Sequence, residues 1–285
     1  LARAEDWSLL PAWLEESVED WSQLAEHVAR RTTMPLLERG RLMGLAVATP
    51  NEAITPSVAD ELSDAQIKLS SAPMVVDLSA LWAGPLCSHI LQQCGFRVVK
   101  VESVQRPDGA REGSPIHFNA LHKGKRLRRF DFADANDLQG LRELLASADV
   151  VIEGSRPRAL RALGLDRDSL MGGACSATSS QLWLSLTAYG RPRPYGDWVG
   201  FGDDVAIAAG AYTLTNNKLP SFLGDAIADP LTGLMGALIV LHLRHWRVCG
   251  LVDLSLFRAV NFCVDWILDS GGVMASPTTY PALRC

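Results

Sequence analysis

The sequence has 285 residues, of which 48% are hydrophobic and 21% charged, so it can bury a substantial core and is not that of a disordered chain. Its most hydrophobic stretch, Leu231–Leu243, contains a histidine and is too short for a membrane span, so it predicts a buried helix. The opening residues lack the apolar core of a signal peptide, and the six cysteines form neither a metal-binding nor a Cys-x-x-Cys pattern. We therefore expect a cytoplasmic protein with reduced thiols, no metal and no membrane partner.

The charges are unevenly placed along the chain. Residues 1–70 contain six Lys/Arg and twelve Asp/Glu, which sets them apart from the nearly balanced remainder. From Arg97 to Arg129, nine basic residues accompany only three acidic ones, an excess that predicts an anionic ligand. The overall net charge of −5 and the lack of a nucleic-acid-binding motif argue against nucleic acid and favour a phosphorylated small molecule.

In chain order, residues 1–45 carry apolar side chains at helical spacing, and residues 48–73 are rich in Pro, Ser, Asn, Asp and Thr, as in a linker. Strands and helices then alternate. We expect strands at Met74–Leu78, Arg97–Val101, Val150–Glu153, Leu182–Thr187 and Leu251–Leu254. We expect helices at Leu86–Cys94, Asp137–Ala146, Ala159–Leu163, Asp203–Leu214 and Pro230–Trp246, and a final helix after the last strand that extends through Asp265.

This alternation predicts an α/β fold with a parallel sheet covered by helices. The predicted organisation is a helical segment at 1–50, a linker at 51–73, an α/β domain at 74–265 and a C-terminal tail at 266–285.

The first βαβ unit of the α/β region is a candidate phosphate site. Gly84 follows the first strand, and Glu102 closes the second, as in a dinucleotide-binding unit. However, Ala83-Gly84-Pro85 supplies a single glycine where the Gly-x-Gly-x-x-Gly fingerprint needs three, and no P-loop sequence occurs. The same residues would also simply start a helix, with a solvated basic surface beside it, so local sequence alone leaves both interpretations open.

Six segments in order resemble the family III CoA-transferases, the CaiB/BaiF type, which includes formyl-CoA transferase and α-methylacyl-CoA racemase. The segments are Val75–Pro85 with Gly95–Glu102, Leu121–Arg126, Val151–Leu160, Leu163–Leu165, Tyr189–Tyr195 and Ala228–Leu234. The sequence departs from the family pattern at Leu127, at Gly154-Ser155 and at Ser103, where the family often has arginine. Residues 1–50 resemble helical small-domain material that in the family follows the CoA-binding half, which implies a permuted or fused order.

The resemblance implies a Rossmann-like CoA-binding domain with a smaller helical region, in an interlocked homodimer. Coenzyme A, as the acyl-CoA substrate, would contact the βαβ unit and nearby residues, with no metal involved. The positions implied are Trp82, Ala83, Gly84, Lys100, Glu102, Lys125, Arg126, Arg156 and Leu163.

Three aspartates are the candidate catalytic residues. Gly200–Ala206 resembles the segment that bears the transferase nucleophile, but an additional glycine makes both Asp203 and Asp204 candidates, with Asp203 fitting the downstream spacing better. Asp229 matches an acid/base aspartate of the racemases, whose histidine partner is missing here. Aspartates at such positions also cap helices, and Asp229 followed by Pro230 has the form of a helix start.

The expected function is transfer of CoA from an acyl-CoA thioester to a carboxylic acid through an aspartyl-CoA intermediate. Two alternatives stay open: racemisation or isomerisation at the α-carbon, and a non-catalytic acyl-CoA-binding subunit.

Overall fold

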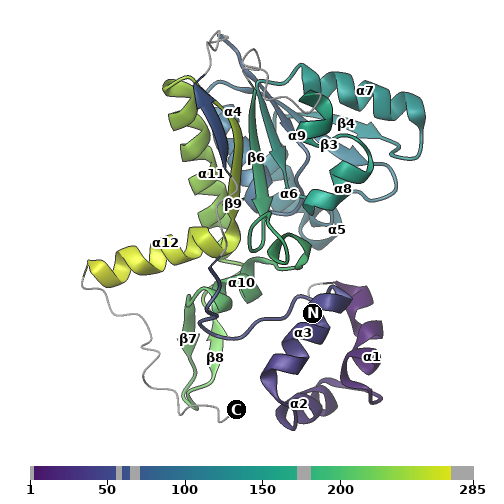
Figure 1. Ribbon diagram of the computed structural model, residues 1–285, viewed down its shortest axis with the longest axis vertical. Helices are drawn as coiled ribbons and strands as arrows, with labels where there is room; N and C mark the ends of the chain where they lie inside the picture. Colours follow the sequence, from purple (N-terminus) through teal and green to yellow (C-terminus); the bar gives the residue numbers. More distant parts are fainter. Residues whose placement is uncertain (1–2, 56–59, 65–70, 172–180, 271–285) are drawn as a thin grey trace.

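The computed structural model describes residues 3–55, 60–64, 71–171 and 181–270, and its main body is a seven-stranded sheet (Figure 1). The strand order is β1-β9-β6-β5-β2-β3-β4, and every neighbouring pair is parallel except β1 with β9. The strands are β1 Glu61–Asp64, β2 Met74–Asp77, β3 Arg97–Ser103, β4 Arg126–Phe130, β5 Val150–Glu153, β6 Leu182–Thr187 and β9 Val248–Ser255.

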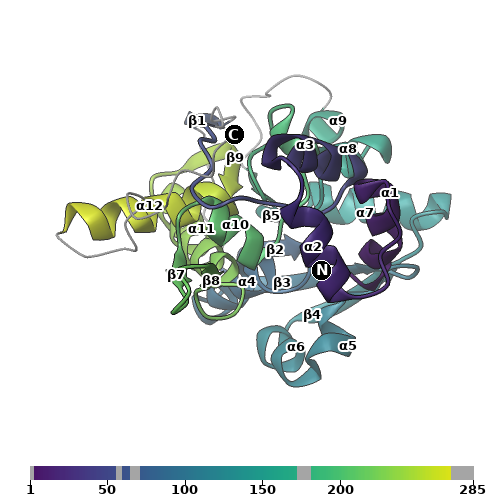
Figure 2. The same ribbon diagram turned by 90° about the horizontal axis from the view of Figure 1, so that it is seen from below.

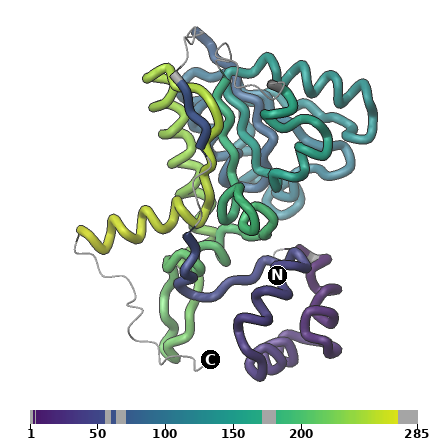
Figure 3. The backbone as a smooth tube through the Cα atoms, in the orientation of Figure 1, coloured from purple at the N-terminus to yellow at the C-terminus, as the bar shows by residue number. Residues whose placement is uncertain are grey.

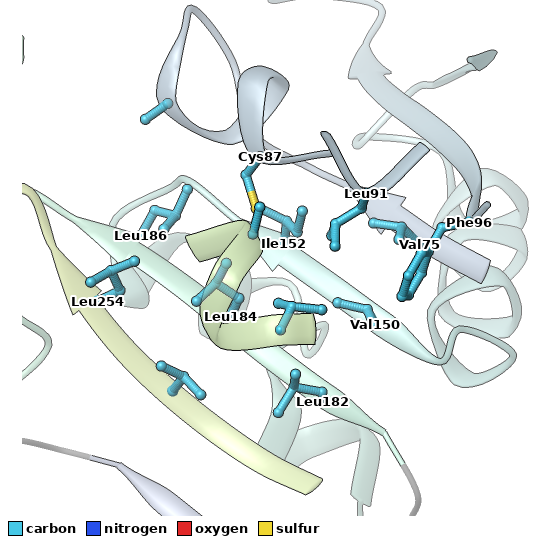
Figure 4. Packing of buried hydrophobic residues seen from close by; sticks show 14 of the residues in the cluster. Val75, Cys87, Leu91, Phe96, Val150, Ile152, Leu182, Leu184, Leu186 and Leu254 are labelled. Atoms are coloured by element: carbon cyan, nitrogen blue, oxygen red, sulfur yellow. The ribbon is translucent and has the colours of Figure 1, made fainter. Parts of the chain in front are cut away.

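Helices cover both faces of the sheet, as expected for a parallel sheet with buried strands. On one face lie α4 (Ala83–Gln93) and α11 (Ala228–His245), and on the other α7 (Ala135–Ala146), α8 (Pro157–Ala162) and α9 (Arg167–Met171). The core beneath α4 and α11 is shown in Figure 4, where Cys87 and Leu91 of α4 meet Ile152 and Leu184 of the sheet. This packing fixes the start of α4 above the carboxyl end of β2.

The remaining elements gather at the carboxyl edge of the sheet. Figure 2 looks toward this edge, with α5 and α6 beyond β4 and with α10 and the β7–β8 hairpin beside α11. Their bounds are α5 Ala110–Gly113, α6 Pro115–His122, η2 Tyr195–Asp197, α10 Gly202–Ala208, β7 Tyr212–Leu214, β8 Pro220–Phe222 and α12 Leu256–Asp269. No helix among the described residues is long and apolar enough to cross a membrane.

The N-terminal helices form a separate small cluster below that edge (Figure 1). They are η1 Ala4–Leu9, α1 Leu10–Leu14, α2 Trp21–Ala29 and α3 Thr33–Met43. Leu10, Leu14 and Leu36 are buried among them, and the Trp13 indole donates a hydrogen bond of 2.9 Å to the Leu36 carbonyl. Figure 3 follows the chain from this cluster past the β7–β8 hairpin, where Asn51 donates to the Tyr212 hydroxyl at 2.9 Å.

Three predictions of local structure need correction. The predicted linker contains β1, which pairs antiparallel with β9 at the edge of the sheet. The helix expected over Asp203–Leu214 ends at Ala208, because Gly210 adopts a left-handed φ of +91°, and Tyr212–Leu214 is a strand. The last helix continues to Asp269, across the predicted start of the C-terminal tail at 266, whose residues 271–285 lie outside the described ranges. The division into domains stays a prediction.

Candidate functional site

Asp229 occupies the junction of three structural elements. It lies in the first turn of α11, and its Oδ1 accepts a hydrogen bond of 3.3 Å from the backbone N–H of Ala83, at the start of α4. The backbone of Gly202, at the start of α10, also hydrogen-bonds this carboxylate. Two main-chain donors from segments far apart in sequence therefore converge on one carboxylate.

Burial raises the pKa of Asp229 to about 6, and the negative charges of Asp203 and Asp225 act in the same direction. The hydrogen bonds from Ala83 and Gly202 oppose this rise because they stabilise the ionised form. Asp229 is thus mostly ionised at neutral pH while being poorly solvated, a condition that suits a carboxylate nucleophile.

Asp203 and Asp204 begin α10 but make different contacts. Asp203 Oδ1 accepts a hydrogen bond of 2.7 Å from the N–H of Ala226, in the turn that leads into α11. Asp204 Oδ1 accepts from the N–H of Phe201 at 2.8 Å, so Asp204 has the capping role that the local sequence predicted. Burial raises the pKa of Asp204 to about 7, and its Oδ2 is buried without a hydrogen-bond partner among the described residues.

The capping role predicted for Asp229 is wrong. Helix α11 begins at Ala228 with Ile227 as its N-cap residue, which places Asp229 inside the first turn and Pro230 one position later. The carboxylate is directed toward α4 instead of back toward its own helix end.

The close approach of Asp229 to α10 depends on Gly202. A Cβ at this position would overlap with Oδ2 of Asp229 and with the backbone of Ala226. We predict that Gly202→Ala displaces Asp229 and lowers the free energy of unfolding by about 1–3 kcal/mol. Thermal unfolding checks this, with Gly113→Ala, whose Cβ would meet open space, as the matched control. Equal unfolding free energies in the two variants would contradict the packing argument.

The predicted CoA-binding turn borders the same carboxylate. Trp82 is the N-cap residue of α4, is half-buried and meets the His117 ring edge-on at 4.8 Å between centroids. Gly84 is buried, and a Cβ there would overlap with the side chain of Ser79, so the chain turns tightly between β2 and α4. The structure therefore brings Trp82, Ala83 and Gly84 together with Asp229.

Several other predicted CoA contacts face the protein interior. Lys125 Nζ donates to the Pro85 carbonyl at 2.8 Å and to Ser88 Oγ at 2.7 Å, and it lies 3.6 Å from Oδ2 of buried Asp77. Lys100 Nζ lies 3.4 Å from Oδ2 of Asp108 and donates to the Ser79 carbonyl. Although burial opposes its ionisation, Asp77 has a pKa below the usual range because Lys100 and Lys125 flank it.

Two further predicted CoA contacts, Glu102 and Arg126, face opposite ways: Glu102 faces the interior and Arg126 faces solvent. Glu102 is buried and forms a bidentate ion pair with Arg111, with N–O distances of 3.0–3.1 Å. Arg126 is exposed at the start of β4. Lys100 and Lys125, which face the interior, support the turn between β2 and α4 through the Ser79 and Pro85 carbonyls.

Arg156 follows β5, beside the carboxyl end of β2. From β2 the chain continues to β3 on one side, and from β5 it continues to β6 on the other side. Ligands of open α/β sheets bind in the crevice between two strands whose connections diverge in this way. Gly154 comes so close to Ser79 that a Cβ would overlap with its side chain, so the two connecting loops touch. Leu163, the C-cap residue of α8, is half-buried against the core on the face of the sheet that α7, α8 and α9 cover.

Arg156 also borders a cavity of about 730 Å³ between the main body and the N-terminal helices. The Arg156 carbonyl accepts a hydrogen bond from the N–H of Ala159, whereas its side chain forms no hydrogen bond or ion pair with another described residue. Burial lowers its pKa, and the positive charges of Arg158 and Arg3 act in the same direction. The cavity is lined by residues of both regions, among them Arg3, Leu9, Leu42, Gly44, Arg156, Arg158 and Trp198.

No group of three or more potential metal ligands occurs among the described residues. The four cysteines in the described ranges, Cys87, Cys94, Cys249 and Cys263, form no disulfide with one another, and Cys175 and Cys285 lie outside those ranges.

Comparison with known proteins identifies the family. The model of "CoA-transferase family III" matches residues 73–271. An "Acyl-CoA transferase" of Fusarium pseudograminearum is 32% identical over 65% of this chain and 44% of its own length. A "Succinyl-CoA--D-citramalate CoA-transferase" of Chloroflexus aurantiacus is 27% identical over 65% of this chain and 48% of its own.

The fold is also that of solved family members. The crystal structure of a CaiB/BaiF family protein from Brucella suis superposes with a TM-score of 0.61 and 26% identity, covering 77% of this chain and 63% of that one. This chain spans about half the length of the curated relatives that it matches. Sequence match and fold agree, and the chain belongs to CoA-transferase family III.

Proposed function

We propose that the protein transfers CoA from an acyl-CoA thioester to a carboxylic acid, with Asp229 as the carboxylate that carries CoA between them. The observation that carries this proposal is the hydrogen bond between Asp229 and the N–H of Ala83 at the CoA-binding turn. A carboxylate that receives CoA must lie where the thioester arrives, and Asp229 touches that turn directly. The names of the relatives, which are CoA-transferases, support the same reaction class.

The reaction proceeds through acyl transfers that balance without ATP. An Asp229 oxygen attacks the thioester carbonyl, the C–S bond breaks, and an acyl-aspartyl anhydride and CoA thiolate form. The thiolate attacks the aspartyl carbonyl, which releases the first carboxylate and leaves an aspartyl-CoA thioester. The acceptor carboxylate then attacks the carbonyl of the aspartyl-CoA thioester, which releases CoA thiolate and forms a second anhydride. The thiolate attacks the acyl carbonyl of the acceptor in this anhydride, giving the new acyl-CoA and free Asp229.

Two features of the chain assist these steps. The N–H groups of Ala83 and Gly202, which hydrogen-bond the carboxylate, are placed to stabilise negative charge on the aspartyl oxygen as it develops. Asp203 holds the turn before α11 through Ala226, so it acts as a positioning residue for Asp229. Sequence resemblance favoured Asp203 as the nucleophile, but its Oδ1 is engaged by Ala226, whereas the contact with the CoA-binding turn belongs to Asp229.

CoA itself would be held along the carboxyl edge of the sheet. The turn Trp82–Gly84 would receive the pantetheine end, and Arg156, a cation without an ion-pair partner among the described residues, would attract a phosphate. Lys100, Glu102 and Lys125 would support this site from inside. We further propose that the protein works as a homodimer, as family resemblance implies, and that it does so in the cytoplasm.

The racemase alternative receives no support from the geometry. It requires a second base facing Asp229 across the α-carbon, and Gly202 or Asp203 occupies the position where the family pattern places a histidine. Any side chain at Gly202 would overlap with Asp229 and Ala226.

A direct test is isotope exchange in the absence of ATP. The protein is incubated with a panel of acyl-CoA esters and the matching isotopically labelled free acids. Transfer of label into the acyl-CoA supports the proposal, while deuterium uptake at the α-carbon without acyl exchange would favour racemisation. Binding without either reaction would leave the non-catalytic subunit.

The pH dependence gives a second test. Asp229 must be ionised to attack, and because its pKa lies near 6, we predict that single-turnover formation of the aspartyl-CoA thioester falls about tenfold per pH unit below 6 and levels off above it. Rates measured between pH 4.5 and 8 check this. Burial raises the pKa of Asp204 to about 7, so Asp204 could also cause a fall in rate at low pH. If Asp204→Asn shows the same fall in rate as the wild-type protein, Asp204 is excluded as its cause. A flat profile would contradict the assignment.

A further inference from the structure

Leu81, in the turn between β2 and α4, has a backbone conformation that leucine rarely adopts. Its φ is +65°, in the left-handed region where the Cβ of an L-residue crowds the backbone. The side chain is 40% exposed, so its own packing supplies only part of the compensation. Such conformations persist where surrounding contacts fix them. Trp82 and Ala83 follow directly, so the conformation of Leu81 sets the direction of the Ala83 N–H.

The contact that fixes Leu81 comes from Asp108. This aspartate lies in the loop after β3, whose carboxyl end is next to that of β2 because the two strands pair in parallel. Its Oδ1 accepts a hydrogen bond of 3.0 Å from the N–H of Leu81 and another of 3.0 Å from the N–H of Ala110, at the start of α5. The Asp108 side chain is fully buried. One carboxylate therefore joins the turn after β2 to the loop after β3.

Lys100 supports this arrangement from inside the sheet. Its Nζ lies 3.4 Å from Oδ2 of Asp108 and donates a hydrogen bond to the Ser79 carbonyl. Ser79 comes two residues before Leu81, so the turn is held at two points. The ammonium of Lys100 and the carboxylate of Asp108 thus act on the same four-residue stretch of backbone.

We propose that Asp108 is a positioning residue for CoA transfer. By holding Leu81 in its left-handed conformation, it directs the N–H of Ala83 toward the Asp229 carboxylate. This inference rests on the proposed function, in which Asp229 carries CoA. Asp108 acts through the backbone of the turn, since it accepts from Leu81, whereas the group that bonds Asp229 is the N–H of Ala83.

A change in this alignment should appear in the ionisation of Asp229. The hydrogen bond from Ala83 stabilises the ionised carboxylate and so lowers its pKa, against the larger effect of burial. If the N–H turns away, the pKa of Asp229 should rise, and the acidic limb of the transfer rate should move to higher pH. The neighbouring carboxylates Asp203, Asp204 and Asp225 are unaltered in variants of the turn, so a shift reports the change at Ala83.

Asp108→Ala removes the acceptor for Leu81, and we expect the midpoint of the acidic limb to rise by about one pH unit. Single-turnover rates between pH 4.5 and 8 measure this. Carboxyl ¹³C NMR titration of aspartate-labelled protein measures the same pKa without turnover, with the Asp229 signal identified by its loss in Asp229→Asn. In Asp108→Ala, Lys100 keeps its hydrogen bond to the Ser79 carbonyl, so the variant should fold.

Two further variants test the route through Leu81. Asp108→Asn retains an oxygen that can accept from the Leu81 N–H, so its midpoint should stay at the wild-type value. Leu81→Gly, added to Asp108→Ala, allows the left-handed conformation without strain and should reverse at least part of the rise. Leu81→Val should raise the midpoint although Asp108 is intact, because a β-branched residue disfavours this conformation more than leucine does.

Asp134 provides the matched control for Asp108. Its Oδ1 likewise accepts from two backbone N–H groups, those of Asn136 and Asp137, but it caps α7, away from the turn between β2 and α4. Asp134→Ala should lower the unfolding temperature and leave the midpoint unchanged. A loss of stability by itself therefore predicts no shift in the pKa of Asp229.

The outcomes separate this inference from the proposed function. A wild-type pKa of Asp229 in Asp108→Ala, or in Leu81→Val if Asp108→Ala does not fold, overturns the inference and leaves the proposed function intact. An equal rise in Asp134→Ala, or a rise in Asp108→Ala that Leu81→Gly does not reduce, also overturns it. A wild-type protein that transfers no CoA overturns the proposed function, while the NMR titration still tests the link between Asp108 and Asp229.

Discussion

Replacing Asp229 with asparagine should abolish CoA transfer and at the same time stabilise the fold. Asparagine cannot form the anhydride or the aspartyl-CoA thioester, so we expect a loss of about 10⁴-fold or more in the transfer rate. The amide oxygen of the introduced asparagine can still accept the hydrogen bond that Ala83 donates to Asp229. Binding of acyl-CoA should therefore persist.

The stability effect follows from the raised pKa of Asp229. The pKa in the folded state is about 6, against 3.8 for an ordinary aspartate, so ionisation of this buried carboxyl opposes folding increasingly as the pH rises from about 4 to 6. Removing the charge should raise the unfolding free energy by about 2 kcal/mol at pH 8 and by much less at pH 3.5. Denaturant titrations at the two pH values measure this difference.

Asp203→Asn is the matched control for Asp229→Asn. Because the amide oxygen of an asparagine in place of Asp203 can still accept from Ala226, we expect partial activity in that variant. An inactive Asp203→Asn beside an active Asp229→Asn would reverse the assignment and restore Asp203 as the nucleophile.

Replacing Lys125 with methionine should destabilise the protein by about 3 kcal/mol, because it leaves buried Asp77 without one of its two neighbouring cations. It also removes the donor to the Pro85 carbonyl and Ser88 hydroxyl. Chemical denaturation measures the loss, and Arg126→Met, at an exposed neighbouring position, should change stability by less than about 0.5 kcal/mol.

A second variant separates the structural role of Lys125 from direct contact with CoA. Adding Asp77→Asn to Lys125→Met removes the unpaired charge and should recover part of the lost stability. If Lys125→Met were as stable as wild type but bound CoA poorly, Lys125 would be a direct CoA contact and the interior role would be wrong.

The α/β core was predictable from sequence because its strands are buried apolar runs. Val150–Glu153 and Leu182–Thr187 are buried along their whole length, and the predicted bounds agree with the structure. The two edge strands were missed for the opposite reason. Glu61–Asp64 and Arg126–Phe130 are polar or charged, a composition that protects sheet edges from further pairing but carries no apolar signal.

The candidate site was predictable only in part. Family resemblance selected Asp203, Asp204 and Asp229, and it selected Lys100 and Lys125 as CoA contacts. The hydrogen bond between Ala83 and Asp229 joins residues 146 positions apart, so its existence depends on how α4 and α11 pack and not on any local pattern. The same holds for the interior direction of Lys125, which is set by Asp77 and Pro85 on other elements.

The most direct test of the central claim is peptide mapping by mass spectrometry after incubation with reactive acyl-CoA esters and trapping with hydroxylamine or borohydride. A trapped acyl-aspartyl anhydride or aspartyl-CoA thioester should place the modification on the peptide containing Asp229, and Asp229→Asn should show none. Modification on the peptide containing Asp203 and Asp204, with Asp229 unmodified, would contradict this account.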